Sequence, residues 1–564
     1  MTPMEDRAEL REYVTSQLSN MKRVRAKGDD RRIQCCAFMN HRVDDQHSPV
    51  SRIRIFNDVP IDSVQTTARG IAGYMLSPSI RWFRYQTMGR NFEPSDNIRG
   101  ANDWLEHVAN RQYEVYANSR FYPVTLEALM DVLIVGTSYE MTSDEVSEGR
   151  IVYDCYSPFE CYIAEDGQRR VNTWFREYSL TADEAYGKWG DECPPEIVEM
   201  VRRKQGTMEC NFIHAIFPRE KAETAEVPMP ASANKRFASV HYSAVGDAVF
   251  HVSGYDDFPL AVHRYSLSSG SPYGDSLVSK NLELIIEAND LKRKQLKATA
   301  KLVDPPTYVP TSLKGRVELN PGSILYGNPQ EGAPVPLQTM IDTKSLREDL
   351  AEVNAMCTRM LFADLFNILM RQDRQRTAYE VQELKGEGLV LLSAIIGNMQ
   401  EEKLNPLVLR TFAIMYRNHM VEEPPEELKK AWSEGRIKIE LDGPLATQMK
   451  QYHQTTGMAQ GLQWISSWAQ LFPESMLNID GDEGMRQGAT AYGFPQSAIR
   501  EKADVDKVKR QQAENQARAQ QQQDALVQSQ VAKNLGMDAQ QMAQAAAAQG
   551  TDAQQMMQNG YLQR

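Results

Sequence analysis

The chain has 564 residues, of which 41% are hydrophobic and 24% charged, and its formal net charge at pH 7 is −12. This length predicts about three to four domains, because one hydrophobic core cannot organise so long a chain. The acidic balance argues against a sequence-specific DNA-binding protein, which usually carries a basic excess, so any contact with nucleic acid should be local or weak.

Membrane insertion and export are not indicated. The longest nearly apolar run, 388–397, is about half a membrane span, and residues 1–13 lack the apolar core of a secretory signal. We expect the protein to be made in the cytoplasm and to stay soluble, without membrane contact.

Helices dominate the first part of the chain. Residues 5–45, 62–76 and 102–130 are predicted to be helical from the spacing of their apolar residues. The apolar face of the first helix is expected to contain Met21, Val24, Cys36, Phe38 and Met39, and that of the third Trp104, Leu105, Val108 and Tyr116.

A β-rich domain is predicted between residues 131 and 264, where short β-branched and aromatic runs alternate with turn residues. Residues 165–168 are predicted to form a hairpin turn, and Thr181 with Glu184 a capping box that begins a helix. The strands are expected at 150–153, 160–163, 171–175, 211–217, 238–242 and 248–252.

Two long helices are predicted to follow, at 275–301 and 343–370. The first ends at Asp304-Pro-Pro306, and the segment 302–342 between the helices is rich in Pro, Gly and β-forming residues. The pattern therefore predicts a helical hairpin with a small folded tip. Its packing seams are expected to be Leu277, Leu284, Leu291 and Ala298 on the first helix, and Leu346, Leu350, Val353, Met356, Met360 and Leu361 on the second.

The last part of the chain is predicted to be a polar loop at 371–376, a helix at 377–418, a strand at 436–440 and further helices at 445–510. Residues 511–564 contain 17 Gln, 12 Ala and no Pro, a composition that favours a helix but packs poorly without neighbours.

Catalytic signatures are absent from the sequence. It contains no GxxxxGK[ST], HExxH or GxSxG pattern, and its seven cysteines form no CxxC. The nine histidines are interpreted as structural or surface residues, and Asp482 with Glu483 as helix-capping residues rather than calcium ligands.

The stretch 292–301 carries five positive charges and no negative one. Arg293, Lys297 and Lys301 recur at every fourth residue, with Lys294 beside them. One interpretation is an ordinary solvated helix face. The other is that the stripe, repeated around a symmetric ring, lines a channel with positive charge.

A series of segments occurs along the chain in a fixed order: the Pro158 turn, 164–168, 171–176, 180–185, 189–190, 213–219, 252–255, Pro259, 262–264, 273–274, 289–291, 304–306, 377–381, 401–410, 443–446 and 479–482. This ordered series resembles the portal, or head-to-tail connector, proteins of short-tailed bacteriophages. One departure is Asp275, which stands where the family usually has a basic residue and is predicted to cap the following helix.

The resemblance implies an α+β, mostly helical portal fold. Its parts would be a wing of α and β structure at 1–274 and 377–444, two stem helices at 275–301 and 343–370, a clip at 302–342, a tunnel loop at 371–376, a crown at 445–510 and a helical tail or barrel at 511–564.

The function that the resemblance implies is that of a non-enzymatic ring of twelve subunits at one capsid vertex of the virion, assembled in the host cytoplasm. Double-stranded DNA would pass through it without sequence preference during packaging and ejection. The implied partners are the terminase large subunit, tail adaptor or head completion proteins, and the major capsid and scaffolding proteins.

Two sets of residues are candidates for these contacts, and neither a catalytic residue, a cofactor nor a metal is expected. The DNA tunnel would be lined by Arg293, Lys294, Lys297, Lys301, Arg371, Arg374 and Arg376. Docking of terminase and tail proteins would use Thr307, Tyr308, Lys314, Arg316, Glu318 and Tyr326.

Two alternatives remain open at the level of sequence. Another virion structural protein, such as a tail adaptor or scaffold, is usually shorter and would not need a β module between two long helices. A metal-dependent nuclease is supported only by Asp and Glu residues without an assigned role.

Overall fold

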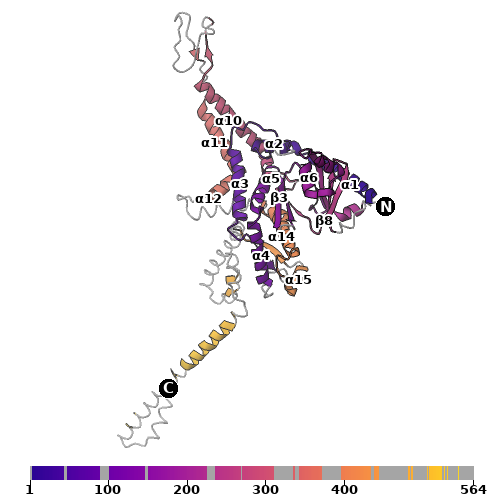
Figure 1. Ribbon diagram of the computed structural model, residues 1–564. Coiled ribbons are helices and arrows are strands. Elements are labelled where there is room, and N and C mark those ends of the chain that lie inside the picture. The colour runs from indigo at the N-terminus through magenta and orange to yellow at the C-terminus, as the bar shows by residue number, and fades with distance from the viewer. Residues whose placement is uncertain are drawn as a thin grey trace. The chain divides into compact units, whose positions relative to one another are not determined.

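The computed structural model divides the chain into two compact units, Met1–Thr456 and Gly457–Arg564, and each is described by itself (Figure 1). The residues that the structure describes are 3–43, 48–88, 101–145, 150–224, 235–267, 270–309, 311, 335–336, 342–370, 395–433, 437–443, 481–482, 484–486, 505, 507–523, 526–527, 530, 541 and 544.

A five-stranded antiparallel sheet forms the β-rich part of the first unit. Its strands follow the chain in the order β4 (Cys161–Glu165), β5 (Val171–Thr181), β6 (Glu209–Pro218), β7 (Phe237–Ser243) and β8 (Ala248–Tyr255). Each of these strands was predicted. Helix α1 (Pro3–Ala26) packs on the sheet through the buried side chains of Leu10, Val14, Leu18 and Met21.

The predicted capping box is confirmed at α6 (Ala182–Trp189), which follows β5. The Thr181 backbone N–H donates to Glu184 over 2.9 Å, and the Glu184 N–H donates to the Thr181 hydroxyl over 3.3 Å. The short elements η1 (Gly190–Glu192), α7 (Pro195–Arg202) and α8 (Arg219–Thr224) complete this part of the unit.

A second, three-stranded sheet has the order β3-β2-β9, from β2 (Thr137–Glu145), β3 (Arg150–Tyr156) and β9 (Leu260–Arg264). Strand β1 (Phe83–Thr87) pairs with β12 (Ile437–Leu441), far along the chain. Strands β1, β3, β9 and β12 share a core with the helices α3 (Val59–Met75), α4 (Ala101–Ala117), α5 (Phe121–Ile134), the π-helix η5 (Gln400–Leu404), α14 (Asn405–Arg417) and α15 (Glu426–Ser433).

The predicted helical hairpin is present. Helices α10 (Leu282–Val303) and α11 (Thr343–Met360) lie side by side (Figure 1). Beyond α10, β10 (Thr307–Tyr308) pairs with β11 (Val335–Pro336) in an antiparallel bridge. The short helix α9 (Leu277–Lys280) precedes the hairpin, and α12 (Ala363–Met370) follows it.

Several predicted helices are interrupted. The helix expected at 5–45 is two helices, α1 and α2 (Asp29–Met39), and that expected at 102–130 is α4 and α5. The two hairpin helices are also broken, at Asn281 and at 361–362. Phe362 has φ +61°, a left-handed conformation that a regular helix cannot contain.

The predicted apolar faces need correction at four residues. Val24 is 40% exposed, because α1 turns its Leu10–Met21 face to the sheet instead. Met356 and Met360 are 41% and 47% exposed, since α11 buries Leu350 and Cys357 on another face. Leu277, predicted to belong to the packing seam of the hairpin, packs instead on residues of α2 and α5 at its base.

Parts of the C-terminal predictions lie outside the described residues, namely 371–394, 444–480 and most of 487–564. In the second unit, residues 507–523 are helical and exposed, as the Gln- and Ala-rich composition predicts. Among the described helices, none combines the length and the apolar character that crossing a membrane requires.

Candidate functional site

Three asparagines join the hairpin to the rest of the first unit. The Asn289 side-chain oxygen on α10 accepts hydrogen bonds from the backbone N–H groups of Phe56 and Asn57, over 2.7 and 3.3 Å. The Asn57 amide donates to the side-chain oxygen of Asn354 on α11 over 2.7 Å. Asn57 thus binds both helices of the hairpin at one level.

Helix α3 fixes the C-terminal end of α11. The Thr67 hydroxyl donates to the Leu361 carbonyl over 2.6 Å, and both residues are buried. At Gly70, an added Cβ would lie 2.3 Å from the ring of Phe366 on α12, so glycine is required for this close approach. The hairpin is therefore docked by buried contacts on both sides of the break at Phe362.

The four basic residues of the predicted tunnel stripe lie on α10 and are exposed. Arg293 forms an ion pair with Asp290 over 2.8 Å, in which both side chains remain more than 40% exposed. Their exposure fits either the solvated-face or the channel interpretation. The other three candidates, Arg371, Arg374 and Arg376, lie outside the described residues.

Two of the predicted docking residues, Thr307 and Tyr308, form β10. Tyr308 is 67% exposed and pairs with Val335, which is 58% exposed. The remaining docking candidates, Lys314, Arg316, Glu318 and Tyr326, lie outside the described residues.

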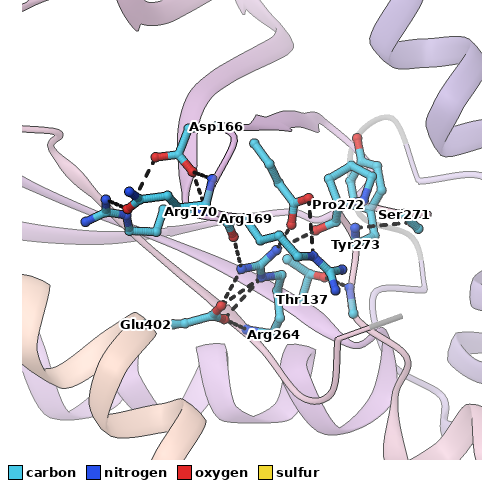
Figure 2. A network of polar contacts seen from close by, with 12 residues as sticks. Thr137, Asp166, Arg169, Arg170, Arg264, Ser271, Pro272, Tyr273 and Glu402 are labelled. Carbon is cyan, nitrogen blue, oxygen red and sulfur yellow. Dashed lines mark hydrogen bonds and ion pairs between the residues drawn. The ribbon is translucent and has the colours of Figure 1, made fainter. Parts of the chain in front are cut away.

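A buried arginine connects the two sheets to η5 (Figure 2). Arg264, on β9, binds the carboxylates of Glu402 and Glu165 and donates to the carbonyl of Arg169 over 2.9 Å. Burial lowers the pKa of Arg264, but the two carboxylates outweigh this effect and the net shift is upward. The side chain is 3% exposed, so it stays charged and fixed in place.

The Tyr273-Gly274 turn is packed against the start of β2. An added Cβ at Gly136 would lie 2.3 Å from the Gly274 carbonyl oxygen, and Gly136 has φ +102°, so both positions need glycine. The Gly274 N–H donates to the Thr137 hydroxyl over 3.0 Å. The helix cap predicted at Asp275 is wrong by one residue, because the Ser276 side chain accepts from the Ser279 N–H instead.

A second buried ion pair joins Lys403 of η5 to Glu140 of β2, with side chains 0% and 3% exposed. Burial raises the pKa of Glu140, and the opposing effect of Lys403 does not cancel the rise. Glu402 and Lys403 are consecutive residues of the π-helix η5, and they bind Arg264 on β9 and Glu140 on β2, two neighbouring strands of one sheet.

Histidines line one row of the five-stranded sheet. His214, His241 and His251 are cross-strand neighbours on β6, β7 and β8. The rings of His214 and His241 stack at 4.0 Å between centroids, and burial lowers the pKa of His241 to about 3. Within the described ranges, no three His, Cys, Asp or Glu side chains are arranged to hold a metal ion.

The contacts described above hold helices and strands of the first unit in fixed positions. Arg264, Glu402 and Lys403 all lie in segments that carried the family resemblance, but their pairing was missed. A charged residue flanked by large apolar residues within a strand, as Glu140 is by Tyr139 and Met141, is the signal in the sequence that could have indicated a buried partner.

Comparison with known proteins shows relatives that match along most of the chain. The family model described as bacteriophage head to tail connecting protein matches residues 11–499. The chain is similar to the portal protein of Salmonella phage epsilon15, with 26% identity over 548 residues that cover 93% of this chain and 95% of the relative. It is also similar to a probable portal protein of Bordetella phage BPP-1, with 25% identity over 479 residues and 83% of each protein covered. The resemblance predicted from the ordered segments is therefore confirmed, and the chain belongs to the family of bacteriophage head-to-tail connecting proteins.

Proposed function

We propose that the protein is a portal subunit that assembles into a ring at one capsid vertex, where the ring is the channel for genome packaging and ejection and the platform for tail attachment. The observation that carries this proposal is the family match over residues 11–499, together with portal proteins as relatives along nearly the whole chain. Its role is structural, without a catalytic site.

The hairpin supports this function physically. Helices α10 and α11 pack on each other, and Asn57 and Thr67 bind them to the rest of the unit. Apolar side chains along them, including Leu296, Leu302, Met356 and Met360, stay more than 40% exposed in the single chain. In a ring, neighbouring subunits would cover such surfaces.

Within this ring, α10 and α11 would be the stem, 302–342 the clip, 371–376 the tunnel loop, 445–510 the crown and 511–564 an extension of the crown. A ring of twelve subunits is proposed from the family. The basic stretch of α10, with Arg293, Lys294, Lys297 and Lys301 as candidates, would contact DNA phosphates, as would Arg371, Arg374 and Arg376. The acidic remainder of the chain would repel DNA and keep it from adhering.

The proposed partners are terminase and tail adaptor proteins at the clip, and capsid and scaffolding proteins around the ring. Exposure of Tyr308 and Val335 at β10 and β11 supports the clip as a docking surface, because large exposed apolar side chains favour protein contacts.

Light scattering of the purified protein tests assembly. The proposal predicts a closed oligomer many times the 64.0 kDa of the chain at micromolar concentration and moderate salt. A protein that remains monomeric over this range would contradict it.

A further inference from the structure

The outer side of α10 carries a pair of exposed cations, Arg293 and Lys297, four residues apart and therefore on one helix face. Ala298, which is 8% exposed, and the half-buried Leu291 mark the face that packs on α11. At about 100° per residue, Arg293 and Lys297 point roughly away from that face. They form the basic edge of the hairpin.

The outer side of α11 carries a matching pair of exposed anions, Glu348 and Glu352, also four residues apart. Leu350 and Cys357 are buried and mark the face of α11 that packs on α10 and the body of the unit. Glu348 and Glu352 lie about half a turn away from these residues. They form the acidic edge, on the opposite side of the hairpin from the basic edge.

The two edges lie at the same level along the hairpin. Asn289 and Asn354 both bind Asn57 and so define a common level on the two antiparallel helices. Counted outward from there, Arg293 and Lys297 are four and eight residues away, and Glu352 and Glu348 are two and six residues away. The two edges are therefore offset by about 3 Å.

A closed ring with one kind of contact joins two different faces of the subunit, one from each neighbour. Rotation about the ring axis keeps every group at its level, so hairpins that run along this axis bring the basic edge of one subunit to the acidic edge of the next. We infer that Arg293 and Lys297 pair with Glu352 and Glu348 of an adjacent copy of this chain. This inference rests on the proposed ring and adds which side chains select the neighbour.

Competing contacts within one chain are weak. Arg293 pairs with Asp290 over 2.8 Å and Glu348 with Lys344 over 3.8 Å, and all four side chains are more than 40% exposed. Such exposed pairs exchange partners easily.

If Arg293 and Lys297 bind the adjacent copy, the tunnel-lining candidates that remain on α10 are Lys294 and Lys301, which lie seven residues apart on an adjacent face.

Charge reversal in the full-length chain tests the pairing. One variant reverses the basic edge (R293E with K297E), another reverses the acidic edge (E348K with E352K), and a third carries all four changes. The concentration and salt dependence of ring formation is measured by mass photometry and light scattering. The control (E199K with R203E) reverses an exposed pair in which Glu199 on α7 contacts Arg203, the residue that follows this helix.

Each single-edge variant should need about tenfold or more protein to form rings, because like charges then meet at every contact. The four-residue variant should assemble like the wild type. An equimolar mixture of the two single-edge variants should also form rings, in which they alternate and opposite charges meet again. The α7 control should be unaffected, and melting temperatures of all variants should stay close to that of the wild type, since the changed side chains are exposed.

Rings that form normally in both single-edge variants would overturn the pairing while leaving the proposed function intact. Failure of both the mixture and the four-residue variant to recover, with folding preserved, would overturn it as well. Absence of rings in the wild type would contradict the proposed function itself. If a charge reversal lowers the melting temperature, the milder variants R293Q/K297Q and E348Q/E352Q are compared with the wild type instead. Weaker ring formation that is less sensitive to salt supports the pairing, and unchanged ring formation contradicts it.

Discussion

Lys403 and Glu140 form an ion pair whose side chains are 0% and 3% exposed. The preceding residue, Glu402, binds Arg264 on the strand next to that of Glu140. Two consecutive residues of η5 thus hold two neighbouring strands, and they join the part of the chain after the hairpin to the sheet that precedes it.

Removal of Lys403 should therefore be costly. We expect the K403M variant to lose about 3–5 kcal/mol in free energy of unfolding, because the buried Glu140 is left without its charged partner. Urea denaturation followed by circular dichroism would measure the loss. The double variant K403M/E140L should recover much of it. The matched control is K429M, which removes an exposed pair with Glu426 and should cost less than about 1 kcal/mol. A K403M protein as stable as K429M would contradict the assignment.

Mild acid should destabilise the five-stranded sheet through its buried histidines. Burial lowers the pKa of His214 and His241 below the ordinary value of 6.5. The neighbouring His241 lowers the pKa of His214 further, and His251 and Lys188 lower that of His241. The unfolded chain therefore binds protons below about pH 6.5 while these folded rings do not, so stability is present above that pH and is lost as the pH falls toward 3.

The expected slope is up to about 1.4 kcal/mol per pH unit for each such histidine. Other charged groups near the row are Arg176 on β5, which opposes protonation of His214, and Glu192, which pairs with the more exposed His251. Unfolding at pH 7.5, 6.5 and 5.5 measures the slope, and H241F should reduce it. A stability that is flat between pH 7.5 and 5.5 would show that the buried histidines do not control it.

Sequence patterns predicted helices and strands well where the residues that determine them lie within a few positions of one another. Thr181 and Glu184 satisfy each other three residues apart, and Asp304-Pro-Pro306 removes the N–H groups that a continuing helix needs. The strands from 150 to 255 followed from their alternation and turns. The break at Asn281 and the exposure of Met356 were missed, because they depend on which surface the body of the unit covers.

The candidate site was predictable only in part. The basic stretch on α10 is visible in the sequence, but the face it occupies depends on how α11 packs, and that separates Arg293 and Lys297 from Lys294 and Lys301. The Lys403–Glu140 pair joins residues of η5 and β2, and no local pattern identifies such partners. The Asn57–Asn354 bond is equally distant in sequence.

Removal of the remaining tunnel charges should affect DNA movement and not assembly. The variant K294Q/K301Q should form normal rings, because both side chains are exposed. Each contact between such a charge and a phosphate contributes about 1 kcal/mol or less to DNA binding. Particles built with it should differ from wild type in packaging, retention or ejection of DNA, measured by DNA content and infectivity. The control R202Q/K204Q removes two exposed charges beside α7 and should be neutral. Normal behaviour of K294Q/K301Q particles in all three assays would contradict the tunnel assignment.

Substitutions at the tip of the hairpin should separate assembly from docking. Tyr308 is 67% exposed on β10, so Y308S should leave ring formation intact and reduce packaging or tail attachment. Electron microscopy would count rings, and plating would count infectious particles. The control M208S changes another exposed apolar residue, far from the hairpin in sequence, and should have little effect. Full infectivity of Y308S, and of further variants at Lys314, Arg316, Glu318 and Tyr326, would contradict a docking role for this segment.

Electron microscopy of the purified full-length protein, with symmetry averaging, shows whether this chain forms the proposed portal ring. We expect closed rings with a central hole, built from twelve subunits. Particles without a central hole or rotational symmetry, or only single chains of 64.0 kDa at micromolar concentration, would contradict it.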